Sequence, residues 1–325
     1  MKTTRSLSTL ALAAALVLSA CGGSDSASDT TAAVTNPTIN VGHTAEPISE
    51  LLAEVYGQAL ESVGFRVGRK DAVADRAATN AGLESGSLQL VPEESGPLLA
   101  SLGAEPPSSD TTAPGDTTAT GDTTAPDDTT GTTTGEPVLL PGELQVAAMN
   151  DALPNTLTVN GAARAVTTPT VACTPAAVEA HSLTDLSSLA AAADDVELGV
   201  PADFDIETLA KAYGATFTTT AVDEQDAADA VAADADCVIV PAVSPVIISA
   251  GLLALDDDLE AIPVSVVAPV VAVAVSTPEL INVLAQVNNA LTTDVLRSLL
   301  VKAEDGSLSY DQVAKQFLAT VSNGQ

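Results

Sequence analysis

The order of apolar and polar positions predicts alternating strands and helices in the first third of the chain. Residues 38–43 form a short strand, and Pro47 opens a helix whose apolar residues recur at helical spacing until Gly64 closes it. The same alternation continues with a strand at 65–67, a helix over 73–85, a strand at 88–91 and a helix starting near Ser95. This alternation is typical of an α/β domain with a largely parallel sheet.

Residues 105–138 interrupt that pattern. The triplet Asp-Thr-Thr recurs with a period of six among Gly, Pro, Ala and Thr, and no apolar residue larger than Ala occurs before Val138. Such a segment cannot bury a core, so we expect a disordered, low-complexity insert in a surface loop. A glycosylated spacer is the functional alternative.

The alternation returns after Val138. The predicted strands are 171–172, 196–200, 215–219, 237–240 and 264–275. The predicted helices are 174–180, 184–193, 206–213, 223–233, 278–291 and 309–321. A second α/β block predicts a second lobe.

The N-terminus has the pattern of a targeting segment. Lys2 and Arg5 precede an apolar run over 10–18, which ends in Leu-Ser-Ala followed by Cys21. This resembles a bacterial lipobox, in which residues 1–20 are removed and Cys21 carries the lipid; an ordinary secretory signal with an incidental Cys is the alternative. Residues 21–37 then form a flexible tether. We therefore expect an extracytoplasmic protein, at the cell surface or in the periplasm, held to the membrane by lipid alone.

The charge and the cysteine content of the chain limit the functions and partners that it can have. The chain has 43 Asp and Glu against 11 Lys and Arg, a net charge of −32, which excludes nucleic acid as a partner. Export leaves Cys173 and Cys237 as a possible disulfide, although Cys237 also suits a small buried residue. No motif for catalysis, for a metal or for a cofactor occurs, so we expect no enzyme and no cofactor.

Several segments carry a further signal in collinear order: 39–42 with 54–60, 63–67, 83–86, 90–96, 182–186 and 291–318. Together with the lipobox, they resemble the substrate-binding proteins of ABC transporters for quaternary amines such as glycine betaine, choline and proline betaine. The resemblance implies a two-lobed, type II periplasmic-binding-protein-like α/β fold with crossing strands. Lobe one would be 38–104 plus 246–325, and lobe two 139–245. The lobes would close on a small ligand and be recognised by an ABC permease subunit.

The resemblance also implies a set of ligand-binding positions: His43, Thr44, Glu46, Ser49, Glu93, Glu94, Ser95, Val243, Ser244 and Ser265. The aromatic residues that the family uses to enclose a trimethylammonium group are absent, because their positions hold Val91, Glu94, Pro241 and Ser265. Glu93 and Glu94 could pair with a cation, or be acidic residues favoured at a helix N-terminus. His43 could contact ligand or be a surface residue.

Two functions remain open from the sequence. The first is the solute-binding component of an ABC importer, with a ligand shifted toward amines that donate hydrogen bonds. The alternative is a degenerate, binding-protein-like surface lipoprotein without a transport ligand. An extracytoplasmic enzyme is the least favoured reading.

Overall fold

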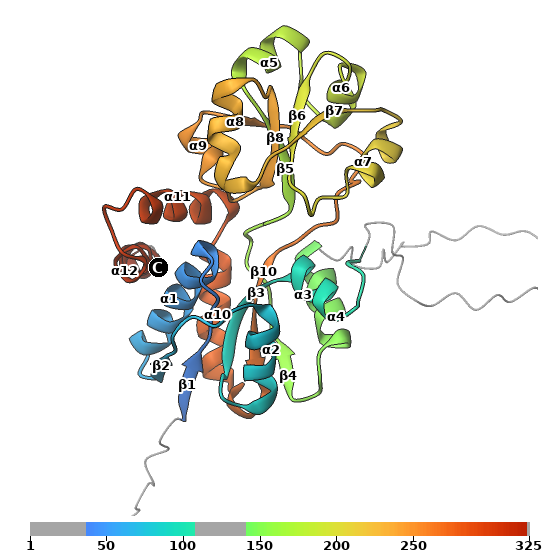
Figure 1. Cartoon of the computed structure of the whole chain (residues 1–325). Coiled ribbons are helices and arrows are strands. Elements are labelled where there is room, and N and C mark those ends of the chain that lie inside the picture. The colour runs from blue at the N-terminus through green and yellow to red at the C-terminus, as the bar shows by residue number, and fades with distance from the viewer. Residues whose placement is uncertain (1–36, 108–140, 324–325) are drawn as a thin grey trace, which may run out of the picture. The chain divides into compact units, whose positions relative to one another are not determined.

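The computed structural model describes residues 37–107 and 141–323 (Figure 1). The predicted signal peptide, the lipidation site Cys21, most of the tether and most of the insert lie outside the described residues. None of the helices in those two ranges has the length and the apolar composition of a membrane-spanning segment.

The first sheet has the strand order β2-β1-β3-β10-β4. Its strands are β1 (Thr38–Val41), β2 (Arg66–Arg69), β3 (Leu90–Glu94), β4 (Leu157–Val159) and β10 (Val267–Ala272). β1 runs parallel to β2 and β3, whereas β10 is antiparallel to both of its neighbours. The carboxyl ends of β1, β2 and β3 therefore meet at one edge of this sheet.

Among the described residues, the helices around this sheet are α1 (Pro47–Ser62), α2 (Arg76–Ser85), α3 (Ser95–Ser101), α4 (Pro141–Ala152), α10 (Pro278–Ala290), α11 (Thr293–Glu304) and α12 (Tyr310–Asn323). α1 forms as the sequence predicts. Pro47 occupies its first turn, Leu51, Leu52, Val55, Tyr56, Ala59 and Leu60 are buried along one face, and the chain leaves it through Gly64 at φ +95°. α10 and α12 pack against that apolar face.

The second sheet has the order β7-β6-β8-β5-β9. Its strands are β5 (Pro169–Cys173), β6 (Glu197–Val200), β7 (Thr218–Ala221), β8 (Cys237–Pro241) and β9 (Leu253–Ala254). Its helices are α5 (Pro175–His181), α6 (Leu186–Ala191), α7 (Ile206–Tyr213), α8 (Ala227–Ala233) and α9 (Val246–Ser249). A disulfide joins Cys173 and Cys237, which lie opposite each other on the antiparallel strands β5 and β8.

The boundaries between the two lobes differ from those predicted, because two strands pair with the other sheet. β4, predicted within the second lobe, pairs with β10 of the first sheet, and β9, predicted within the first lobe, pairs with β5 of the second. Leu255 and Ile262 still pack in the core of the second sheet, so the segments that cross between the sheets are 160–168 and 263–266. They pair with each other, because Thr167 donates its backbone N–H to Ser265 O over 2.8 Å.

Other differences concern single elements. α11 was not predicted, although Leu296, Leu299 and Leu300 are buried at helical spacing. The predicted strand over 264–275 is shorter, since β10 ends at Ala272 and a 3₁₀ turn follows. β3 continues beyond the predicted end at residue 91 to Glu94. That extension carries both glutamates of interest into the sheet.

Candidate functional site

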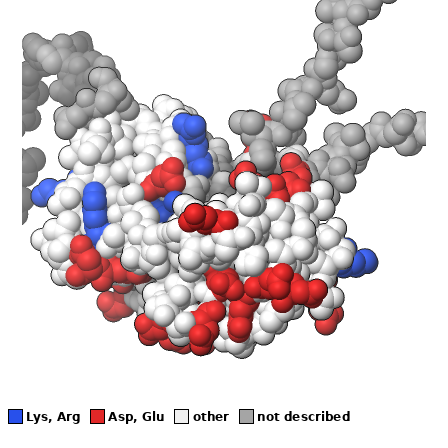
Figure 2. Space-filling view, turned by 90° about the horizontal axis from the view of Figure 1, so that it is seen from above, with Lys and Arg blue, Asp and Glu red and all other residues white. Residues whose placement is uncertain are grey.

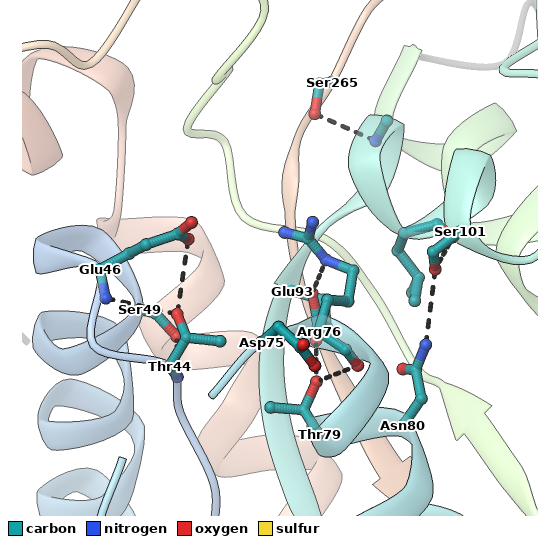
Figure 3. A network of polar contacts seen from close by, with 12 residues as sticks. Thr44, Glu46, Ser49, Asp75, Arg76, Thr79, Asn80, Glu93, Ser101 and Ser265 are labelled. Carbon is teal, nitrogen blue, oxygen red and sulfur yellow. Dashed lines mark hydrogen bonds and ion pairs between the residues drawn. The ribbon is translucent and has the colours of Figure 1, made fainter. Parts of the chain in front are cut away.

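A polar cluster occupies the edge of the first sheet where the carboxyl ends of the parallel strands meet. Open α/β sheets bind ligands outside the carboxyl ends of their strands. We call this group the edge cluster and define it by residues from the three strand-to-helix loops and the two crossing segments: His43, Thr44, Glu46, Ser49, Arg76, Glu93, Glu94, Ser95, Thr167 and Ser265. Figure 3 labels six of them, Thr44, Glu46, Ser49, Arg76, Glu93 and Ser265.

An ion pair anchors the cluster. Arg76, the first residue of α2, donates from Nε to Glu93 Oε2 over 2.8 Å, and the Thr79 hydroxyl lies 3.1 Å from the other carboxylate oxygen (Figure 3). The Glu93 side chain is only 5% exposed. Burial raises the pKa of Glu93, while the charge and hydrogen bond of Arg76 oppose that rise. Both oxygens of Glu93 are thus engaged within the protein.

Glu94 has a different environment. It is the last residue of β3 and half-buried, and it directly precedes α3. Burial raises the pKa of Glu94 to about 7, a hydrogen bond with Thr167 and the charge of Arg76 oppose the rise, and Glu46 and Glu93 add to it. Its negative charge is therefore poorly compensated inside the protein. A cation at this position would supply the missing counter-charge.

The loop between β1 and α1 contributes one accessible carboxylate. The Thr44 backbone N–H donates to Ser49 Oγ over 3.0 Å, and the two His43 ring nitrogens lie 2.8 and 3.1 Å from the carbonyls of Thr44 and Lys70. These contacts order the loop. Glu46 is exposed at the N-cap of α1, where the Thr44 hydroxyl donates to it over 3.4 Å.

Two predicted ligand-binding serines hold the crossing segments instead of presenting a hydroxyl to solvent. Ser95 Oγ accepts the backbone N–H of Val266 over 3.0 Å, and Ser265 Oγ accepts the N–H of Gly96 over 3.1 Å (Figure 3). Both serines are buried. They fix the start of α3, and with it Glu94, relative to the crossing strands.

Val243 and Ser244 lie in the turn after β8, and both are buried. Val243 packs with the apolar core that contains α1 and α10. On the same turn, the Ala242 carbonyl accepts hydrogen bonds from Nε and Nη2 of Arg297 in α11, the former over 2.8 Å. The structure thus places these two residues in a turn that rests on α11.

All seven aromatic residues of the chain pack into its cores. Tyr56, Phe65 and Phe317 are buried in the first core, with Tyr310 packed against it, and Phe204, Tyr213 and Phe217 pack against the second. The Tyr56 hydroxyl donates to Asn288 over 2.6 Å. The edge cluster therefore has no aromatic ring with which to enclose a quaternary ammonium group. Nor does the described part of the chain contain a group of residues suited to a metal ion.

The surface of the protein is predominantly negative, as is the edge cluster. In the space-filling view, Asp and Glu far outnumber Lys and Arg on the visible face (Figure 2). A protein of net charge −32 concentrates cations near its surface and repels anions.

Arg76 and Thr167 are the members of the cluster that the sequence analysis did not identify. A signal for Arg76 was present, since Asp75 is an N-cap whose side chain accepts the N–H of Ala78. This N-cap marks the end of the β2–α2 loop, which lies at the same edge of the sheet as the β1–α1 and β3–α3 loops.

Two α/β lobes joined by two paired crossing segments, with a polar cluster at the edge where those segments cross, define a type II solute-binding protein. Over residues 37–320 the chain matches the family described as the substrate binding domain of ABC-type glycine betaine transport systems, and it belongs to that family. It is therefore the solute-binding component of an ABC importer. The family is extracytoplasmic and non-enzymatic.

Solved structures agree with this fold at low sequence identity. A glycine betaine/carnitine/choline ABC transporter protein shares 15% identity with a TM-score of 0.72, covering 88% of this chain and 98% of that one. Apo YehZ from Escherichia coli shares 19% identity with a TM-score of 0.65, covering 87% and 98%. Lactococcal OpuAC, closed on glycine betaine, shares 11% with a TM-score of 0.52, covering 88% and 96%. No curated protein sequence matches the chain significantly.

Proposed function

We propose that this protein captures a small cationic or zwitterionic amine that carries N–H donors and delivers it to an ABC permease. The observation that carries the proposal is the half-buried Glu94, whose charge lacks full compensation and which stands where the family resemblance places a cage aromatic. An ammonium with N–H groups satisfies that carboxylate by both charge and hydrogen bonds. Trimethylammonium offers only charge.

The absence of aromatic residues at the expected positions should weaken the binding of glycine betaine. A cation–π contact contributes about 0.5 to 2 kcal/mol, so three or four missing contacts remove about 2 to 5 kcal/mol. That corresponds to a factor of about 30 or more in affinity. We expect a glycine betaine dissociation constant of about 0.1 mM or weaker.

The charges of the edge cluster favour a cation. Arg76 neutralises Glu93 across the 2.8 Å ion pair, which leaves the carboxylates of Glu94 and Glu46. Contact of a bound amine with both lobes would favour the closed conformation, because a ligand shifts a conformational equilibrium by its differential affinity. Closure would then present the loaded protein to the permease.

The experiment is calorimetry near pH 8 with agmatine, L-arginine and putrescine set against glycine betaine and choline. We expect micromolar binding of at least one N–H-bearing amine, weakened about tenfold or more in Glu94→Gln. Glu84→Gln, which removes an exposed carboxylate of α2, is the matched control and should leave affinity unchanged. Micromolar binding of glycine betaine that survives Glu94→Gln would refute the proposal.

Membrane attachment through a lipid on Cys21 belongs to the same proposal. The support is the sequence pattern at residues 10–21, together with the extracytoplasmic family. Cys21→Ala should release a folded protein from the membrane fraction. Retention of that variant after a high-salt wash would contradict the anchor.

A degenerate surface lipoprotein without a transport ligand is the second candidate. It is favoured by the internal engagement of Glu93, Ser95 and Ser265. Under this reading no amine of the panel would raise the melting temperature.

A further inference from the structure

Thr167 connects Glu94 to both crossing segments. It lies in the first of these segments, and its buried hydroxyl donates to Ser265 Oγ of the second segment over 3.0 Å. The same hydroxyl is hydrogen-bonded to the carboxylate of Glu94 at the end of β3. Ser265 Oγ in turn accepts the backbone N–H of Gly96 over 3.1 Å (Figure 3). A continuous chain of polar groups therefore runs from Glu94 through one crossing segment into the other.

The Thr167 hydroxyl has two oxygen partners but only one proton to donate. When Glu94 is protonated, its carboxyl group can donate to Thr167 while Thr167 donates to Ser265. When Glu94 is ionised it can only accept, so the Thr167 proton turns toward it, and the Ser265 hydroxyl can donate to Thr167. Thr167 and Ser265 are only 3% and 5% exposed, which shields these hydroxyls from bulk water. The direction of the chain therefore follows the charge of Glu94.

We infer that Thr167 is a positioning residue of the amine site, whose hydroxyl donates to the ionised carboxylate of Glu94 and holds it in place for the bound ammonium. This inference rests on the proposed function. A hydrogen bond donated to a carboxylate favours its ionised form, which is the form that attracts a cation. Thr167 thus opposes burial, which raises the pKa of Glu94. The charged groups that face this carboxylate are Arg76, which also opposes the rise, and Glu46 and Glu93, which add to it.

Removal of the Thr167 hydroxyl tests the inference. Thr167→Val keeps the shape of the side chain but has no proton to donate, so half-ionisation of Glu94 should move from about pH 7 to about pH 8. The agmatine dissociation constant, measured by calorimetry, should then rise about fivefold at about pH 7 and about twofold at about pH 8, because the ionised fraction falls by these factors. Thr167→Ser keeps the hydroxyl and should restore the wild-type pH dependence.

Thr168→Val is the matched control. Thr168 lies in the same crossing segment, and its hydroxyl accepts the backbone N–H of Ser265 over 2.8 Å. Among the described residues, no hydrogen bond joins Thr168 to Glu94. Thr168→Val should therefore lower the melting temperature but leave half-ionisation of Glu94 at about pH 7. A purely structural role of Thr167 would give this same result in Thr167→Val.

An NMR titration of the Glu94 carboxyl carbon in the ligand-free protein separates this inference from the proposed function. An unchanged or lowered pH of half-ionisation in Thr167→Val would overturn the role of Thr167 and leave the proposed amine site standing. Agmatine binding with the same pH dependence in the wild type and in Thr167→Val would overturn it equally. Failure of every amine of the panel to bind would refute the proposed function, and with it a role of Thr167 in amine binding. Thr167→Ala removes the same hydroxyl and replaces Thr167→Val in these measurements if that variant does not fold.

Discussion

Acidification should weaken amine binding because the carboxylate that binds the cation takes up a proton. The pKa of Glu94 is raised to about 7 by burial, with Glu46 and Glu93 facing the same site and Arg76 opposing them. Only the ionised carboxylate attracts a cation. With a pKa of about 7, about nine-tenths of Glu94 is ionised at about pH 8 and about one-hundredth at about pH 5. The apparent dissociation constant scales inversely with that fraction until it reaches the value of the neutral site, so it should rise by between about tenfold and about a hundredfold, and by no more than Glu94→Gln weakens binding.

The assay is calorimetric titration of agmatine at about pH 8, 7, 6 and 5, because the charge of agmatine does not change over this range. Titration near pH 7 in two buffers of different ionisation enthalpy should show the release of a fraction of a proton on binding. In Glu94→Gln the affinity should be weak and nearly independent of pH. A wild-type dissociation constant that changes less than about threefold between these limits would refute the assignment of the counter-charge to Glu94.

The stability of the protein should also respond to pH, to two substitutions and to deletion of the insert. The pKa of Glu94 in the folded protein lies above its unfolded value of about 4.5. The ligand-free protein should therefore lose up to about 3 kcal/mol of unfolding free energy as the pH rises from about 4.5 to 7, as measured by urea denaturation. A loss of stability on acidification over the same range would contradict this prediction. Arg297→Ala should cost about 1.5 to 3 kcal/mol, because its bonds to the carbonyl after β8 are charge-assisted, and a cost under about 0.5 kcal/mol would contradict that role. Replacing Cys173 and Cys237 by Ala should cost about 4 kcal/mol in the chain-entropy account, for a sequence separation of 64; equal melting temperatures with and without reductant would oppose it. Deleting 106–136 should leave the melting temperature unchanged, and a fall of several degrees would show that the insert contributes to packing.

Elements whose start and end are marked by residues in the sequence itself, such as a proline or a glycine, were predictable. α1 has apolar spacing, a proline at its start and a glycine at its end, and each signal is contained in the sequence itself. β4 has three residues, and its membership of the first sheet depends on pairing with β10, more than a hundred residues away. α11 has the apolar spacing of a helix, with Leu296, Leu299 and Leu300 buried on one face, so its periodicity alone was sufficient to predict it.

The site was predictable in position but not in detail. The strand ends and the family resemblance identified Glu93 and Glu94. The sequence of two adjacent glutamates does not show which of them is paired with a positively charged side chain. That depends on Arg76 and Thr79, which reach Glu93 from α2. Arg76 itself was missed because the helix was expected to begin at residue 73. The structure begins it at Arg76, and this places the side chain at the sheet edge.

Binding of an amine at Glu94 can be observed in a crystal structure of the protein grown near pH 8 with L-arginine. We expect a ligand nitrogen about 2.7 to 3.2 Å from a carboxylate oxygen of Glu94. A ligand bound elsewhere, or one at the edge cluster whose nitrogens all lie beyond about 4 Å from Glu94, would contradict it.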